Sequence, residues 1–256
     1  MEAPHAAAMP RFALRIAYDG TDFAGWWRQP DRRTVAGVLD QAFVRLGEPD
    51  AQAEGASRTD AGVHARAQLA HVDCRRTWDP AELTMRLNRH LPAEVAVRSV
   101  TVVADDWNAI AAIAHKTYRY RLDVGPTPDP FLARTAWRPA WSERLDHARL
   151  ASAVALLPGE RDWTAFIRRG ERREATRCRM LRAGCTRTGD VLAIDLTASG
   201  FVYRLARSLV GACLLVARGG AEPEDLAVAL AGTVNACARE QAPAHGLCLE
   251  RIRLRR

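Results

Sequence analysis

The first part of the chain carries two different periodicities of apolar residues. Between residues 12 and 18, apolar side chains alternate with Arg and Ala, and a period of two predicts a half-buried strand. Between residues 35 and 46 the apolar side chains recur at helical spacing, with Thr34 at the N-cap position and Gly47 just after the end. The elements predicted here are strands at 12–18, 67–72 and 95–103 and helices at 35–46 and from residue 80 onward.

The remainder of the chain shows the same mixture of periods. Tyr118, Tyr120 and Leu122 alternate with Arg119 and Arg121, which predicts a strand with one aromatic and one basic face. The other elements predicted here are a helix at 145–157, a hairpin of strands 177–183 and 191–197 across residues 188–190, helices at 201–216 and 223–230, and a last strand at 247–254.

This order of elements predicts an α+β fold built from two α/β halves, each a mixed or antiparallel sheet with flanking helices. We expect a disordered leader at 1–10, an N-terminal half at 11–105 and a C-terminal half at 106–256. Two such halves leave a cleft between them, and substrate sites tend to lie in clefts of this kind. The candidate site is therefore expected in a central cleft.

The charge balance favours a polyanionic partner. Lys and Arg number 37 and Asp and Glu number 30, so the formal net charge is +7, and the sequence pI is about 9.5. A basic excess of this size is typical of proteins that bind nucleic acid, and it predicts that the central cleft is basic. Only Lys116 among the 37 basic residues is Lys, a bias that codon usage in a GC-rich genome explains. The net charge is therefore better evidence than the richness in Arg.

Cysteine usage and hydropathy indicate a reducing location away from membranes. The six cysteines show no C-x-x-C pair of the kind that zinc and redox sites use, and apolar neighbours predict buried thiols at Cys213, Cys237 and Cys248. The longest apolar run, at 209–217, is too short to span a bilayer. Residues 1–10 lack the apolar core of a signal peptide, so we expect a cytoplasmic protein.

The segment richest in chemistry runs from Gly55 to His64 and lies between a predicted helix and a predicted strand. Glycines flank a polar centre, so one reading is a turn in which Asp60 accepts hydrogen bonds from nearby backbone amides. The other reading is a catalytic carboxylate. A metal site that would combine His64, His71, Asp73 and Cys74 fits no recognised ligand spacing.

Several motifs, in the same order along the chain, resemble those of the tRNA pseudouridine synthase A family. The loop Arg58-Thr-Asp60-Ala-Gly-Val-His64 is similar to the family's catalytic loop, and Lys116-Thr-Tyr118-Arg-Tyr120 to its central strand. Each motif alone is weak, but together they cover nearly the whole chain from residue 12 onward. The other matching segments are Asp22-Phe-Ala-Gly-Trp26, Arg33 to Leu39, Leu87 to Pro92, Gly200 to Gly211 and Ala242 to Leu247.

This resemblance implies a pseudouridine synthase fold and an isomerase that converts uridine to pseudouridine at positions 38, 39 and 40 of the tRNA anticodon stem-loop. It also implies a homodimer. No cofactor and no metal is expected, because the base that leaves the sugar is the same molecule that returns to it. The reaction breaks the N1 glycosidic bond, turns the uracil and joins its C5 to the same sugar carbon.

The resemblance assigns roles to four positions. Asp60 is expected to be the catalytic carboxylate, which either attacks C1′ or removes a sugar proton. Arg58 is expected to help displace the target base, since an enzyme must unstack a base to reach its sugar. Tyr118 is expected to pack against the flipped uracil. Arg207 is expected to pair with Asp60 and to keep its carboxylate ionised and aimed.

Two positions depart from the family, and some residues have simpler readings. Ile110 stands where the family usually has Arg, and Trp27 where Gln is common, which puts one RNA contact in doubt. Tyr118 could be a core aromatic, as Tyr120 is expected to be. The basic stretch 168–173 could line a groove for the RNA backbone or form a solvated loop.

Two other functions fit parts of the pattern. The chain could be a non-catalytic RNA-binding module of the same fold, or a metal-dependent phosphoesterase that uses Asp60, His64 and His71. The combination of Asp60, Tyr118 and Arg207 argues against the first alternative. The lack of a second carboxylate cluster argues against the second.

Overall fold

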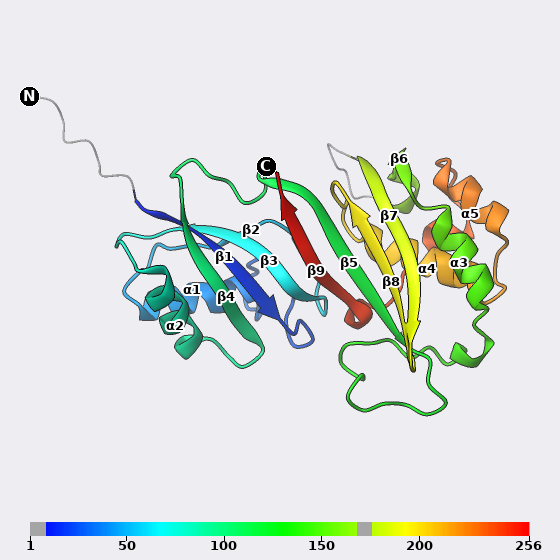
Figure 1. Ribbon diagram of the computed structural model, residues 1–256, viewed down its shortest axis with the longest axis horizontal. Helices are drawn as coiled ribbons and strands as arrows, with labels where there is room; N and C mark the ends of the chain where they lie inside the picture. The colour runs from blue at the N-terminus through cyan, green and yellow to red at the C-terminus, as the bar shows by residue number, and fades with distance from the viewer. Residues whose placement is uncertain (1–8, 168–175, 256) are drawn as a thin grey trace, which may run out of the picture. The chain divides into compact units, whose positions relative to one another are not determined.

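The computed structural model describes residues 9–167 and 176–255. Within this part the chain forms two compact units, which divide between Ile113 and Ala114 (Figure 1). The last residues, from Leu254, return to unit 1.

The described ranges and the division into units bear on three predictions. The basic stretch 168–173 and most of the leader predicted at 1–10 lie outside the described residues. The domain boundary predicted between residues 105 and 106 lies earlier in the chain than the division between the units. The segment 106–113 accordingly belongs to unit 1.

Unit 1 contains an antiparallel sheet and two helices (Figure 1). Its strands lie in the order β4-β1-β3, and the short β2 pairs with β3. Arg11 of β1 lies opposite Asp73 of β3 and opposite Val103 of β4. In chain order the elements are β1 (Arg11–Tyr18), α1 (Val35–Arg45), β2 (Glu54–Gly55), β3 (His64–Asp73), α2 (Pro80–His90) and β4 (Val95–Val103).

Local chemistry explains where the helices of unit 1 begin. The Thr34 hydroxyl accepts a hydrogen bond from the Gly37 amide at 3.2 Å and so caps α1. Asp79 caps α2 in the same way, and Pro80 occupies the first turn, where its missing N–H is not needed. The strands and helices predicted for this half are confirmed.

In unit 2 the described strands lie in the order β9-β5-β8-β7-β6. The predicted hairpin is confirmed, because β7 and β8 pair antiparallel as far as Thr188 opposite Val191. Helices α3, α4 and α5 contact one another. The elements are β5 (Ile113–Asp123), α3 (His147–Ala155), β6 (Gly159–Asp162), β7 (Arg177–Thr188), β8 (Val191–Ala198), α4 (Leu205–Ala217), α5 (Pro223–Leu230), α6 (Ala236–Arg239), β9 (Leu247–Leu254) and the 3₁₀ turns η1 (Ser142–Arg144), η2 (Thr164–Phe166) and η3 (Ala244–Gly246).

Helix α4 is the most buried helix of unit 2. Every residue of this fully described helix except Arg207 is buried. The predicted start at residue 201 was wrong, since the helix begins at Leu205. Arg204, just before it, has a left-handed backbone conformation (φ 61°), and a right-handed helix cannot continue through such a residue. Phe201 therefore lies in the loop that precedes the helix.

The predicted α+β fold is confirmed, although two short strands, one short α-helix and the 3₁₀ turns were not predicted. Strands β2 and β6 and helix α6 have two to four residues each, which is too few to show a period. The predicted burial of Cys213, Cys237 and Cys248 is confirmed. No helix in the described part of the chain has the length and apolar character that a membrane span requires.

Helix α4 packs closely against the segment before η3 at Gly211. A Cβ atom on Gly211 would lie 2.8 Å from the Gln241 amide nitrogen and 3.0 Å from its Cα. These are backbone atoms, which cannot turn aside as a flexible side chain would. Glycine is therefore required if the helix and this segment are to pack as they do.

We expect Gly211→Ala to lower the free energy of unfolding by about 1–3 kcal/mol, because the added methyl group overpacks the contact. A Gly→Ala change in a helix without such a contact would stabilise the protein instead. The control is Gly184→Ala on β7, where the new methyl group meets no atom within 4 Å. Urea unfolding of the three proteins measures both changes, and equal stability of the two variants would contradict this packing.

Candidate active site

Asp60 lies in the loop between β2 and β3 of unit 1, and neighbouring backbone and side-chain contacts hold this loop. The hydroxyl of buried Thr59 lies 2.7 Å from the phenol oxygen of Tyr18. The Thr59 carbonyl accepts a hydrogen bond from the Trp26 amide at 3.1 Å. The Asp60 carbonyl accepts another from the Val63 amide at 3.2 Å, which closes a turn. The backbone on both sides of the half-buried Asp60 carboxylate is thus fixed.

The segment 22–26, far away in the sequence, packs directly against this loop. Gly25 has a φ of 100°, and a Cβ atom there would lie 2.7 Å from the Thr59 carbonyl oxygen. Only glycine satisfies both conditions. The Phe23 carbonyl also accepts a hydrogen bond from the Gly62 amide at 3.3 Å. Two of the motifs that carry the family resemblance therefore form one substructure within unit 1.

A fully buried glutamine completes the support of the loop. The Gln68 side-chain oxygen accepts a hydrogen bond from the Ser57 amide at 3.2 Å, and its nitrogen donates to the Ser57 carbonyl. The same nitrogen lies 3.4 Å from the Tyr18 phenol oxygen. The sequence patterns did not indicate Tyr18 or Gln68 as residues of the site. The available signal was a polar side chain between apolar neighbours in the strand predicted at 67–72.

Arg58 is exposed, and its guanidinium lies 4.5 Å from the ring centre of Trp27. Trp27 is itself 45% exposed. Such a cation–π contact at an exposed site contributes about 0.5–1 kcal/mol, so it biases the position of Arg58 without fixing it. The tryptophan that departs from the family pattern is thus the neighbour of the residue expected to displace the base.

The two histidines of the phosphoesterase alternative lie at opposite ends of β3. The Nδ1 atom of buried His64 accepts a hydrogen bond from the Gly20 amide at 3.0 Å and lies 3.1 Å from an Asp19 carboxylate oxygen. His71 is seven residues further along, about 23 Å away at the rise of a strand. One metal ion cannot bind both. Among the described residues, moreover, no three His, Cys, Asp or Glu side chains are grouped so that they could hold a metal ion.

In unit 2, Tyr118 lies on β5 and is 6% exposed. Its ring meets that of Phe201 edge-on, with 4.9 Å between the ring centres. Tyr120, two residues along the same strand, is fully buried and donates a hydrogen bond to the Pro243 carbonyl at 2.9 Å. The prediction that Tyr120 is a core residue is confirmed.

Arg207 on α4 is held by the segment that precedes η3. Its Nε donates a hydrogen bond to the Ala242 carbonyl at 2.8 Å, and the Ala242 amide donates to the Arg207 carbonyl at 3.0 Å. Burial raises the pKa of Tyr120, and the positive charge of Arg207 opposes this rise. The motifs at 200–211 and 242–247 and the central strand therefore meet within unit 2.

The four predicted site residues are thus divided between the units. Arg58 and Asp60 lie on one loop of unit 1, two residues apart. Tyr118 and Arg207 lie on β5 and α4 of unit 2. The pairing of Arg207 with Asp60 stays a prediction.

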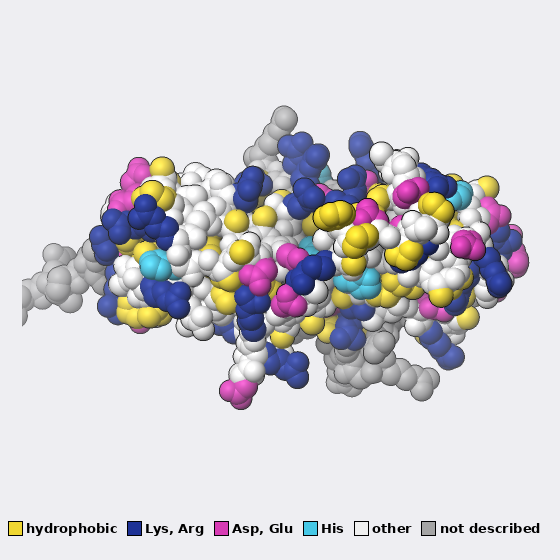
Figure 2. Space-filling model, turned by 90° about the horizontal axis from the view of Figure 1, so that it is seen from below, with side chains coloured by type: hydrophobic (Ala, Val, Ile, Leu, Met, Phe, Trp, Pro, Cys, Tyr) yellow, Lys and Arg dark blue, Asp and Glu magenta, His cyan; other side chains and the backbone are white. Residues whose placement is uncertain are grey.

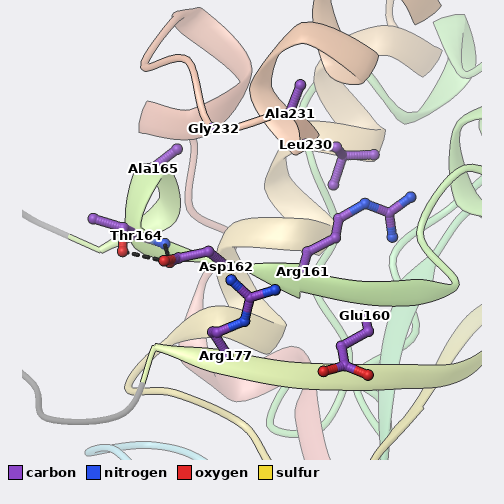
Figure 3. A pocket seen from close by; sticks show the side chains of 9 residues that line it. All are labelled: Glu160, Arg161, Asp162, Thr164, Ala165, Arg177, Leu230, Ala231 and Gly232. Atoms are coloured by element: carbon purple, nitrogen blue, oxygen red, sulfur yellow. Dashed lines mark hydrogen bonds between the residues drawn. The ribbon is translucent and has the colours of Figure 1, made fainter.

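A separate pocket of about 530 Å³ lies in unit 2, and the four predicted site residues do not line it (Figure 3). Its walls come from β6, η2, Arg177 and residues 230–232. Arg161 donates to the Leu157 carbonyl at 2.8 Å, and so its guanidinium is engaged at the end of α3. Asp162 accepts hydrogen bonds from the backbone and side chain of Thr164, as the dashed lines in Figure 3 show.

Comparison with known proteins agrees with the arrangement of the motifs. The family model described as tRNA pseudouridine synthase matches residues 15–110 and 153–254. The chain belongs to this family. It is 37% identical to the tRNA pseudouridine synthase A of Gloeobacter violaceus over 94% of the chain and 79% of that protein. With the tRNA pseudouridine synthase A of Sinorhizobium medicae the identity is 36%, over 95% of the chain and 99% of that protein.

Membership of the tRNA pseudouridine synthase family makes the chain an isomerase, of the class that converts uridine to pseudouridine in tRNA. The α+β fold and the suspected resemblance are both confirmed by these matches. The matched ranges include Asp60 with its loop and also Arg207. Tyr118 falls between them, so its role depends on the motif around it.

The hydrogen bond between Tyr18 and Thr59 yields a prediction about the loop. We expect Tyr18→Phe and Thr59→Val each to lower the free energy of unfolding by about 1–3 kcal/mol, because each leaves a buried hydroxyl without this partner. The double variant removes both groups and should cost less than the sum of the two. Denaturant unfolding of the four proteins measures this coupling, and strict additivity would show that the contact stabilises nothing.

Proposed function

We propose that the chain isomerises uridine to pseudouridine at positions 38, 39 and 40 of the tRNA anticodon stem-loop, as a cytoplasmic homodimer. The observation that carries the proposal is the anchored loop around Asp60. Contacts with Tyr18 and Trp26 hold Thr59, and the turn to Val63 leaves the Asp60 side chain as the loop's carboxylate. A site must hold a reactive group within a narrow range of positions, and this loop meets that requirement.

Asp60 has the chemistry that the reaction needs. Breaking the N1–C1′ bond leaves a sugar carbon short of electrons, which a carboxylate can relieve by attack at C1′ or by removal of the C2′ proton. Either route uses a single anionic oxygen and returns it unchanged at the end. One carboxylate on a fixed loop is therefore sufficient for the proposed isomerisation.

The other three residues act on the base and on the carboxylate in this proposal. Arg58 is exposed and makes a ring contact with Trp27, which leaves it able to move into the RNA as the base leaves the stack. Tyr118 offers the uracil a ring held in place by Phe201. Arg207, fixed to Ala242, supplies the positive charge that keeps Asp60 ionised.

The charges of the molecule favour a large polyanion as substrate. The net charge is +7, and in the face shown in Figure 2 dark-blue basic side chains are interspersed with magenta acidic ones. The phosphates of a folded RNA are spread along its backbone and can contact a protein surface at many separate positions. Basic side chains scattered over the surface therefore suffice for binding. This pattern supports tRNA as the partner and does not by itself select the anticodon arm.

The absence of an Arg at position 110 does not disturb the local fold. Ile110 is 56% exposed, and the Asn108 side chain accepts hydrogen bonds from the amides of Ile110 and Ala111 at 2.8 and 3.1 Å. The turn is thus formed without the family's usual arginine. Its loss removes one positive charge from the surface and leaves the loop of Asp60 intact.

The proposed target positions are tested by mapping pseudouridines in tRNA from cells with and without the protein. We expect those at 38, 39 and 40 to disappear and all others to remain. Purified protein with stem-loops that carry a single uridine at one of these positions gives the same answer in vitro. If binding occurs and no uridine is converted in either experiment, the chain is an RNA-binding module and not an isomerase.

The role of Asp60 is tested by Asp60→Asn, which keeps the shape and removes the charge. We expect stem-loop affinity to change by less than about threefold and single-turnover conversion to fall by more than about 10³-fold, within the range of positioned acid–base groups. The control is Asp106→Asn, an exposed site in the same unit with the same loss of charge, which should convert at the wild-type rate. A folded Asp60→Asn protein with appreciable activity would reduce Asp60 to a turn residue.

A further inference from the structure

Lys116 is the single lysine of the chain, and it lies on β5 two residues before Tyr118. From Lys116 to Asp123 the strand pairs with β8 without a shift in register, and Lys116 lies opposite Ala198. Successive residues of an unbroken strand point to opposite faces of the sheet. Lys116, Tyr118 and Tyr120 therefore share one face of β5, with about 7 Å between Lys116 and Tyr118 along the strand.

A charged amine on this face of β5 loses part of its hydration, which costs free energy. Tyr118 is 6% exposed and Tyr120 is fully buried, so the two neighbours along the face are withdrawn from water. Burial also lowers the pKa of Lys116 to about 8. A lysine that served only solubility would extend its amine into solvent and keep its ordinary pKa. Lys116 instead lies on the same face of β5 as the aromatic ring that is proposed to hold the uracil, two residues away.

Charged residues close to Lys116 on β5 form ion pairs with the neighbouring strands. The cross-strand partner of Lys116, Ala198, is apolar, and Leu196 lies opposite Tyr118. On the other face of β5, Arg119 forms an ion pair with Asp195 of β8 at 2.7 Å, and Arg121 with Glu250 of β9 at 2.6 Å. Further titratable groups also act on this strand: Arg207 of α4 acts on Tyr120, Cys248 of β9 acts on Arg119, and Arg138 forms an ion pair with Asp123.

We propose that Lys116 is a further catalytic residue, whose ammonium group contacts the flipped uracil and stabilises the negative charge that develops on it. The proposal rests on the isomerase function proposed above. When the N1–C1′ bond breaks, its electron pair stays on N1, and the uracil becomes an anion with its charge shared among N1, O2 and O4. A fixed cation beside an anion that exists only after bond cleavage lowers the barrier without strengthening substrate binding.

The steps balance without any other reactant. While the uracil is free, one of two states holds. Either C1′ is bonded to the Asp60 carboxylate, or C2′ has given its proton to that carboxylate. The uracil turns, and an electron pair at C5 forms the new bond to C1′ as the carboxylate leaves or returns its proton. C5 then loses its proton and N1 gains one, so the product is neutral. Lys116 begins and ends as ammonium.

Three variants separate charge from structure. We expect Lys116→Met to lower the single-turnover rate by about 10²–10³-fold, as removal of one stabilising donor does, while stem-loop affinity changes by less than about threefold. Lys116→Arg keeps the charge and should retain activity within about tenfold of wild type. Arg66→Met, at an exposed position of β3, is the control for loss of one positive charge and should act as wild type. A Lys116→Met protein that folds and converts uridine at the normal rate would overturn the proposal.

The pH profile provides a readout that a structural role would not move. Because Lys116 of the free protein loses its proton as the pH rises through about 8, the wild-type kcat/KM should fall about tenfold per unit above that point. The guanidinium of Lys116→Arg stays charged, so this fall should be absent there. Ionisation of uridine itself is common to both proteins and cancels in the comparison. Identical alkaline limbs in the two proteins would contradict the assignment.

A second measurement does not depend on turnover or on the folding of Lys116→Met. Growth on ¹³C-labelled lysine gives one set of side-chain signals, since the chain has one lysine. In Asp60→Asn protein we expect a stem-loop with uridine at position 39 to shift these signals and raise the pKa of Lys116, and one with cytidine at 38–40 to do neither. Signals that do not respond to the uridine stem-loop would refute the contact. If wild-type protein converts no uridine, the isomerase function fails, and this titration still decides whether Lys116 meets the base.

Discussion

The position of the Asp60 carboxylate, which we propose to be catalytic, depends on a buried hydrogen bond between the hydroxyls of Tyr18 and Thr59. Tyr18 is the last residue of β1, which lies between β4 and β3, so this contact ties the loop to the central strand of unit 1. Gln68 reaches the same phenol oxygen from β3 and holds Ser57 on the other side of the loop. A surface loop without such anchors would sample many conformations, and its carboxylate would rarely be in a reactive position.

In unit 2 a backbone carbonyl stabilises the positive charge of Arg207 on an otherwise apolar helix. Arg207 is the one residue of the buried helix α4 that is not itself buried, and the Ala242 carbonyl binds its guanidinium. A charge in such surroundings is stable only if its donors are satisfied, and the segment before η3 provides an acceptor. The approach of α4 at Gly211 brings this segment close enough. Backbone packing thus supports the electrostatics of this part of the site.

The departures from the family pattern fall on exposed positions of unit 1. Trp27 offers Arg58 a ring, and a glutamine at that position would offer only a polar side chain. Ile110 leaves its turn intact because Asn108 caps it. Both positions can change without affecting the buried network around Thr59, since neither contributes to it. Both departures are thus exposed, whereas the anchors of the loop lie in the core.

The sequence by itself determined the elements and the chemical candidates. Periods of two and 3.6 located the long strands and helices, because burial of one face leaves that mark on every element long enough to show it. The motif around Asp60 identified the carboxylate. The start of α4 was missed, because the left-handed conformation of Arg204 is set by the surrounding packing and not by its residue type.

Only the tertiary structure decided which residues support the candidates. Tyr18 lies 41 residues from Thr59 and 50 residues from Gln68 in the sequence. No local pattern indicates contacts between residues so far apart. The role of Gly25 likewise depends on a carbonyl that another segment brings near. Sequence periodicity reflects the burial of individual residues, and it does not depend on which residues they contact. A hydrogen bond between distant segments depends on how the folded chain brings them together, and the sequence pattern of either segment does not show this.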